Sequence, residues 1–91
     1  MADSWWLYMI ECEGGGMYVG IAKDVQARYR QHEEGKGALY TKLRRPLRLL
    51  AAREYPSHKL AAQAEREMKK LPAWEKWRWA YALGGGACAD N

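Results

Sequence analysis

Two short apolar segments on either side of three consecutive glycines open this chain, and they constrain its fold more than any other feature. Residues 5–11 read Trp-Trp-Leu-Tyr-Met-Ile-Glu, residues 17–21 read Met-Tyr-Val-Gly-Ile, and residues 14–16 between them are all glycine. Aromatic and aliphatic runs of this length are typical of strands, and a glycine-rich break is typical of a tight turn. The opening of the chain therefore predicts a β-hairpin.

A helix and a third strand are expected after the hairpin. Asp24 is a suitable N-cap for a helix that continues to about residue 34, where Gly35 would end it. Residues 35–46 are rich in glycine and basic side chains and predict a loop. Residues 47–53 alternate loosely between apolar and polar and predict the third strand.

Two more helices are expected in the second half of the chain. Ser57 would cap a helix that ends near residue 71, and Pro72 suits the first position of the next helix because its fixed φ is helical. The glycines at residues 84–86 would end that last helix. The order of two strands, a helix, a strand and two helices predicts an α/β fold, with a small sheet and helices packed against it.

The length of 91 residues allows one hydrophobic core. We expect a single domain over residues 1–83 and a disordered glycine-rich tail over residues 84–91. The apolar run at residues 5–10 is too short for a membrane span. Cys12 and Cys88 are far apart and form no Cys-x-x-Cys pair, which argues against a structural zinc site. We expect a soluble cytoplasmic protein.

Basic side chains are concentrated in the middle of the chain. Lys and Arg exceed Asp and Glu by 15 to 11 overall, and residues 21–53 alone hold nine bases and three acids, a net charge of +6. The rest of the chain is therefore net −2. A charge concentrated in this way favours a polyanionic partner, most simply DNA or RNA. The alternative is a basic loop that is merely solvated.

Charged side chains interrupt the apolar stripes of the first two predicted helices. Arg28 and His32 lie at core-facing spacing on the first helix, and Glu65 lies within an otherwise apolar stripe on the second. A charge at such a position needs a cation, a metal ion or a water-filled cleft. Each residue also has a structural interpretation, such as an ion pair between Arg28 and Glu65, or a satisfied helix histidine at position 32.

The spacing of these residues, taken with two strand tyrosines, resembles the GIY-YIG nuclease superfamily. The resemblance covers residues 5–80 and is carried by Trp6-Leu7-Tyr8, by Tyr18-Val19-Gly20, and then by Arg28, His32 and Glu65. Residues 18–28 look like the same segment of UvrC-type excision nucleases. Residues 35–46 and 61–71 look like the small standalone YhbQ-like members, which are similar to the catalytic subunit of endonucleases that cut branched DNA.

The resemblance implies a three-stranded antiparallel sheet flanked by helices and one divalent metal ion, Mg²⁺ or Mn²⁺, held by glutamate. The implied catalytic residues are Tyr8, Tyr18, Arg28, His32 and Glu65, and Glu65 is the implied metal ligand. The sequence departs from the family pattern in two places. Trp6 and Leu7 replace the Gly and Ile of the first motif, and Ile21 replaces a lysine of the UvrC-type enzymes.

The chemistry of phosphodiester hydrolysis suits this set of side chains. Arg28 can donate two parallel hydrogen bonds to the non-bridging oxygens of a phosphate. A magnesium ion on Glu65 can neutralise charge at the leaving oxygen, because Mg²⁺ commonly takes only one or two carboxylates and keeps its waters. We expect Tyr8 to activate or position the attacking water, with Tyr18 and His32 completing its hydrogen-bond network. The choice of base among these three residues stays open.

The predicted partner is nucleic acid, DNA more than RNA, selected by its structure in repair or recombination. The residues expected to bind it are Lys23, Lys36, Tyr40, Lys42, Arg44 and Arg45, with the tyrosine available for stacking. The alternatives are an inactive GIY-YIG-like module that binds nucleic acid or recruits a partner, and an unrelated basic binding domain. The Trp-rich third helix leaves a homodimer or a larger repair complex open.

Overall fold

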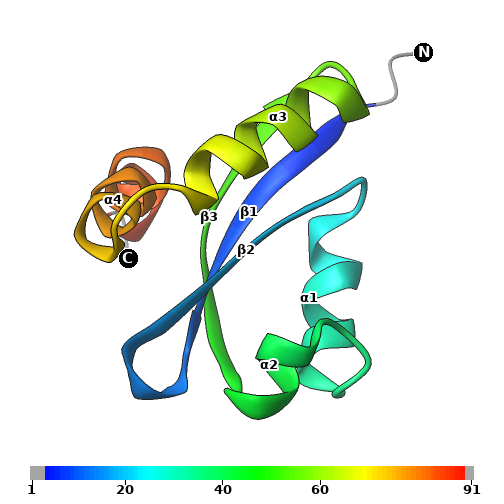
Figure 1. Cartoon of the computed structure of the whole chain (residues 1–91), viewed down its shortest axis with the longest axis vertical. Helices are drawn as coiled ribbons and strands as arrows, with labels where there is room; N and C mark the ends of the chain where they lie inside the picture. Colours follow the sequence, from blue (N-terminus) through cyan, green and yellow to red (C-terminus); the bar gives the residue numbers. More distant parts are fainter. Residues whose placement is uncertain (1–3, 90–91) are drawn as a thin grey trace.

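The computed structural model describes residues 4–89 and contains one three-stranded antiparallel sheet in the order β2-β1-β3 (Figure 1). The strands are β1 (Trp5–Cys12), β2 (Gly16–Ala22) and β3 (Pro46–Tyr55), and a 3₁₀ turn at Glu13–Gly15 joins the first two. The helices are α1 (Val25–Glu33), α2 (Leu39–Leu43), α3 (His58–Lys69) and α4 (Ala73–Ala89). The predicted fold class and the antiparallel sheet are confirmed.

The hairpin turn depends on glycine. Gly14 and Gly15 have φ angles of 75° and 77°, in the left-handed region that other L-residues rarely adopt. The turn sets the register of β1 and β2, in which Tyr8 pairs with Gly20 and Ile10 pairs with Tyr18. This register places Tyr8 and Tyr18 diagonally on the same face of the sheet.

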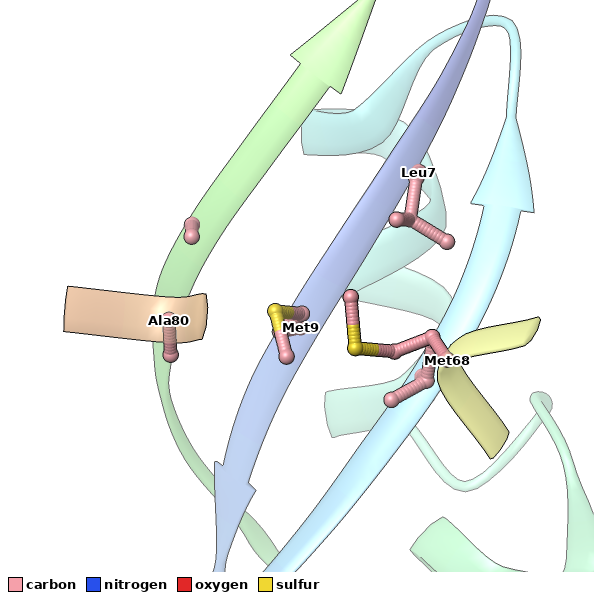
Figure 2. Packing of buried hydrophobic residues seen from close by; sticks show 6 residues of the cluster. Leu7, Met9, Met68 and Ala80 are labelled. Atoms are coloured by element: carbon pink, nitrogen blue, oxygen red, sulfur yellow. The ribbon is translucent and has the colours of Figure 1, made fainter. Parts of the chain in front are cut away.

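One face of the sheet carries the main hydrophobic core. Successive side chains of β1 point to opposite faces, so Leu7 and Met9 share a face. They pack against Met68 from α3 and Ala80 from α4, and all four side chains are buried (Figure 2). Each fully buried Leu or Met stabilises the fold by about 1.5–3 kcal/mol. This contact fixes α3, and with it the neighbouring Glu65, against the sheet.

The other face of the sheet is covered by α1. Tyr8, Ile10 and Cys12 of β1 form a second buried cluster there, against which Val25 and Tyr29 of α1 pack. Figure 1 shows α1 and α2 together on one side of the strands and α4 on the other. The second face therefore combines packed apolar side chains with the polar hydroxyl of Tyr8.

The predicted helix caps are confirmed. The Asp24 carboxylate accepts a hydrogen bond from the backbone N–H of Ala27 at 3.1 Å, and the Ser57 hydroxyl accepts one from the N–H of Leu60 at 3.2 Å. Gly35, which follows α1, has a φ angle of 76°. Caps of this kind contribute about 1 kcal/mol each and fix the first turn of the helix.

Two predicted helix and loop boundaries are wrong. Residues 35–46 are not all loop, because Leu39–Leu43 form the short helix α2. Helix α4 does not end at the three glycines but continues to Ala89. Glycine costs a helix only about 1 kcal/mol relative to alanine, and a helix that is already nucleated can extend through such residues.

The limits of the domain at residues 1–83 stay a prediction. The tail predicted to be disordered over residues 84–91 has a helical backbone as far as Ala89, and residues 90–91 lie outside the described part of the chain. Within residues 4–89, no helix combines the length and the apolar character that a membrane crossing needs.

Candidate active site

The site begins with the two tyrosines of the hairpin. Tyr8 is buried on the central strand β1, with only 1% of its surface exposed, and Tyr18 lies on the edge strand β2. Their ring centroids are 6.2 Å apart. A glycine faces Tyr8 across the hairpin, and a Cβ on Gly20 would lie 2.6 Å from the Tyr8 hydroxyl oxygen and 2.9 Å from the Tyr18 ring. The glycine therefore provides the space in which both rings fit.

His32 connects Tyr8 to helix α2. The His32 ring is 1% exposed, and its Nε2 lies 2.9 Å from the Tyr8 hydroxyl while its Nδ1 lies 2.8 Å from Thr41 Oγ1. The Thr41 hydroxyl donates its own proton to the Ala38 carbonyl at 2.8 Å. Thr41 must therefore accept the hydrogen bond from His32, which places the His32 proton on Nδ1.

The direction of this hydrogen-bond chain fixes the role of Tyr8. Because His32 Nδ1 carries the ring proton, Nε2 has a free lone pair and accepts a hydrogen bond from the Tyr8 hydroxyl. The chain runs from Tyr8 through His32 and Thr41 to the Ala38 carbonyl. A buried acceptor is thus in place for the proton that Tyr8 would release.

Tyr8 and His32, the two titratable residues of this hydrogen-bond chain, are both neutral at neutral pH. Burial raises the pKa of Tyr8 to about 12, and the nearby Tyr18 contributes in the same direction. The Arg28 guanidinium, within hydrogen-bonding reach of the Tyr8 hydroxyl, opposes that rise. Burial, and then the positive charge of Arg28, lowers the pKa of His32. The protein alone therefore keeps Tyr8 as a phenol and His32 as a neutral imidazole.

Arg28 lies one helical turn before His32 on α1. Its Nη1 donates a hydrogen bond to the Gln31 side-chain oxygen at 2.7 Å. Within residues 4–89, Arg28 makes no ion pair with Glu65, whose carboxylate pairs instead with Lys69. The structural ion pair that the sequence left open is therefore not formed, and the guanidinium keeps donors for a ligand.

Glu65 reaches the same region from α3, which contacts both β1 and β2. Its side chain is 22% exposed, and Lys69 Nζ lies 3.2 Å from its Oε2. The same ammonium lies 5.9 Å from the centre of the Tyr18 ring, and the negative charge of Glu65 contributes to the raised pKa of Tyr8. The structure thus brings the five predicted residues to one region: Arg28 acts on the Tyr8 hydroxyl, and the Lys69 ammonium lies next to both Glu65 and the Tyr18 ring.

Helix α2 closes one side of the site. The Tyr40 ring stacks on the Tyr18 ring, with centroids 6.1 Å apart and planes inclined by 30°. Glycine is needed in the segment before α2 and on the facing strand β2, where both pack closely against the site. A Cβ on Gly37 would collide with the His32 ring, and a Cβ on Gly16 would collide with the Tyr40 hydroxyl.

Four of the six residues predicted to bind nucleic acid lie together. Tyr40, Lys42, Arg44 and Arg45 lie on α2 or directly after it, near the hairpin turn, where Arg44 Nη1 donates to the Glu13 carbonyl oxygen at 3.4 Å. Lys42 and Arg45 line a hollow of about 350 Å³ with His32 and Thr41.

Lys36 and Lys23, the other two residues predicted to bind nucleic acid, contact other side chains of the protein. Lys36 is highly exposed and forms an ion pair with Glu34 at 3.7 Å. Lys23 lies at the far end of β2 from the hairpin turn, with its ammonium 5.7 Å from the Trp5 ring centre. The basic surface beside the site is therefore formed mainly around α2.

Comparison with known proteins identifies the family. A family model described as the GIY-YIG catalytic domain matches residues 4–76. This chain belongs to the GIY-YIG family. GIY-YIG domains are nucleases, and they generally use a divalent metal ion. The suspected resemblance is confirmed, and the matched segment contains all five residues of the site.

Small proteins named UPF0213 are similar to this GIY-YIG chain along most of their length. One from Cupriavidus pinatubonensis is 46% identical over 79% of this chain and 80% of the relative. Another from Staphylococcus aureus is 41% identical over 84% of this chain and 93% of the relative. The solution NMR structure of a UPF0213 protein from Bacillus halodurans matches with a TM-score of 0.59 and 38% identity, over 90% of this chain and 87% of that chain. The UPF0213 name states no activity.

The donor set of this GIY-YIG site fits a lightly coordinated divalent ion. Within residues 4–89, no three His, Cys, Asp or Glu side chains lie close enough to share a metal ion. Glu65 offers a partly buried carboxylate, 22% exposed, whose charge reaches Tyr8. A single carboxylate suits Mg²⁺, which usually keeps several waters, and does not suit a closed protein-only cage.

Two residues of the site were missed in the sequence. Thr41 is buried, at 2% exposure, and completes the chain from Tyr8, but it lies in a segment predicted to be loop. Nothing in its local sequence marks it. Lys69 follows Glu65 by four residues on a helix, and this i,i+4 spacing is a signal from which the ion pair could have been predicted.

Proposed function

We propose that this chain is a metal-dependent endonuclease that hydrolyses phosphodiester bonds in DNA and selects the DNA by its structure. The observation that carries the proposal is the Tyr8 hydroxyl, which donates to the buried His32 Nε2 at 2.9 Å and whose pKa responds to both Arg28 and Glu65. This arrangement combines a proton relay, a guanidinium and a carboxylate at one place. These groups can supply a base and charge stabilisation for phosphodiester hydrolysis.

Tyr8 and His32 together act as the base for the attacking water. The water gives a proton to the Tyr8 oxygen as the Tyr8 proton passes to His32 Nε2, and the resulting hydroxide attacks phosphorus. The bond from phosphorus to the leaving oxygen breaks as the new bond forms, and the leaving oxygen takes a proton from solvent water. His32 becomes an imidazolium whose Nδ1–H stays hydrogen-bonded to Thr41. The relay removes the need for a free phenolate, which the pKa of about 12 makes scarce at neutral pH. Tyr18 packs beside Tyr8 and restricts where the water can lie.

Arg28 and Glu65 stabilise the charge that develops at phosphorus. The hydrogen bond from Arg28 to Gln31 holds the guanidinium in place, so that it can donate to the non-bridging oxygens with little rearrangement. Glu65 would hold one divalent ion, Mg²⁺ or Mn²⁺, which supplies charge neutralisation at the phosphate and the leaving oxygen.

The surface around α2 positions the DNA backbone. Lys42, Arg44 and Arg45 would contact phosphates, and Tyr40 offers a half-exposed ring edge next to Tyr18. Lys36, exposed before α2, and Lys23, at the far end of β2, would add separate phosphate contacts. Phosphate contacts fix position without reading bases, so the preference falls on DNA shape, as in repair or recombination substrates.

A cleavage assay over several DNA structures tests this function. Labelled single-stranded, duplex, flap and branched DNA would be incubated with Mg²⁺, Mn²⁺ or EDTA, and the products separated on a denaturing gel. We expect cutting of at least one structure with Mg²⁺ or Mn²⁺ and none with EDTA. Binding of every substrate without cutting under any metal would refute the nuclease and would indicate a binding module instead.

A further inference from the structure

Lys69 contacts two residues of the proposed site from one side chain. Its ammonium lies 3.2 Å from Glu65 Oε2 and 5.9 Å from the centre of the Tyr18 ring. Lys69 is four residues after Glu65 on α3, so the helix itself places the two side chains on one face. The ammonium therefore lies where Glu65 would bind a metal ion.

We propose that Lys69 is a positioning residue that occupies the Glu65 carboxylate as an internal cation and is displaced when a divalent ion binds there. Displaced from Glu65, the ammonium becomes available to a phosphate oxygen of the bound nucleic acid. Lys69 thereby couples occupation of the metal site to substrate binding. The inference rests on the proposed function, since it assumes that Glu65 is the metal ligand.

Competition follows from charge and geometry. Two cations on one carboxylate repel each other, so a divalent ion can bind Glu65 fully only when the ammonium moves away. Lys69 can move, because its side chain is 52% exposed and its flexible four-carbon stem lets the ammonium swing towards solvent or along the Tyr18 ring. In the absence of nucleic acid, a divalent ion must displace the Lys69 ammonium from Glu65 and should therefore bind weakly.

A structural role explains Lys69 less well. A single i,i+4 ion pair on a helix contributes little to stability, and the Lys69 ammonium, on a side chain that is 52% exposed, is readily solvated when the pair separates. The fold has no need of the pair, since α3 is held by Met68 and Ala61 in the core. The effect of removing the lysine should therefore appear in ligand binding, while the stability of the domain changes little.

Manganese binding without nucleic acid tests the competition. Isothermal titration calorimetry with Mn²⁺ would compare the wild type with Lys69→Met, which keeps the side-chain length and a high helix propensity. Lys70→Met is the matched control, because it removes the same charge from the adjacent position at the C-cap of α3. We expect Lys69→Met to bind Mn²⁺ about three- to tenfold more tightly than the wild type, and Lys70→Met to differ by less than about twofold.

A third variant separates this inference from the proposed function. If Glu65→Gln binds Mn²⁺ as the wild type does, then Glu65 is not the ligand, and both the metal site and the role of Lys69 are overturned. If Glu65→Gln loses binding but Lys69→Met equals the wild type, then only the inference about Lys69 fails.

The second half of the proposal is tested by DNA binding. Fluorescence anisotropy would measure the affinity for a short labelled DNA in EDTA and again in Ca²⁺, which binds oxygen ligands. Lys69→Met should bind DNA about as well as the wild type in EDTA, where Lys69 is paired with Glu65, and about two- to fivefold more weakly in Ca²⁺. An equal loss under both conditions, or no loss under either, would overturn the coupling.

Discussion

Replacing Thr41 with valine removes one hydroxyl from the buried relay and keeps the shape of the side chain. Thr41 is 2% exposed, and its hydroxyl accepts a hydrogen bond from His32 Nδ1 at 2.8 Å. The Ala38 carbonyl, which that hydroxyl also contacts, still accepts from the backbone N–H groups of Thr41 and Lys42 at 3.1 and 3.2 Å. The substitution therefore leaves His32 Nδ1 as the group that loses its hydrogen-bond partner.

The magnitude follows from the two ways in which His32 can respond. If its proton stays on Nδ1, a buried donor is left unsatisfied, which costs about 1–3 kcal/mol of unfolding free energy. For a domain of this size each kcal/mol lowers Tm by about 4–8 °C. If the proton moves to Nε2 instead, the ring donates to Tyr8 and can no longer accept its proton. The relay is broken in that case, and about 10²–10⁴-fold of general base catalysis is lost.

Thermal unfolding and single-turnover cleavage would be measured together on Thr41→Val, with Thr41→Ser as the control that keeps the hydroxyl. The valine variant should lose stability, cleavage or both by the amounts above, and the serine variant should retain most of its cleavage rate. A valine variant with the unfolding midpoint and the cleavage rate of the wild type would refute the relay from Thr41 through His32.

Three further predictions concern packing, pH and phosphate contacts. Gly20→Ala places a Cβ 2.6 Å from the Tyr8 hydroxyl and should cost about 1–3 kcal/mol in urea unfolding; a variant as stable as the wild type would show that the site has more room than described. Because burial lowers the pKa of His32, the unfolded chain takes up this proton more readily, so unfolding free energy should fall as pH drops below about 6.5. Urea titrations from about pH 7 to pH 5 on a His58→Gln background isolate this effect, and a flat profile would contradict it. Lys42→Ala should weaken DNA binding and reduce the salt slope by about one, whereas an unchanged slope would mean that Lys42 touches no phosphate.

The parts of the fold that local patterns determine were predictable from the sequence. Two apolar runs with a glycine break between them specified the hairpin, and Asp24 and Ser57 specified two helix starts through side-chain hydrogen bonds to nearby backbone. These interactions span only a few residues. Helix α2 was not predictable in this way, because its buried Thr41 is held by a histidine nine residues away. The end of α4 was missed because glycine only weakens a helix and does not stop it.

The members of the site were predictable as a set of spaced residues, but the hydrogen bonds that connect them were not. The breaks in the apolar stripes at Arg28, His32 and Glu65 marked the side chains that the fold now brings together. The sequence could not choose among Tyr8, Tyr18 and His32 as the base. That choice depends on which nitrogen of His32 carries the proton, and the proton position depends on Thr41. Tertiary hydrogen bonds of this kind leave no periodic trace in a sequence.

The measurement that tests the central claim most directly is metal-dependent single-turnover cleavage by Glu65→Gln compared with Glu67→Gln. Both variants remove one carboxylate from α3, but Glu67 is exposed and lines a groove beside Leu7 and Met68 on the core side of the sheet. Loss of cleavage with Glu65→Gln and near wild-type cleavage with Glu67→Gln is the predicted result. Cleavage that survives Glu65→Gln would contradict the assignment of this site as the catalytic centre.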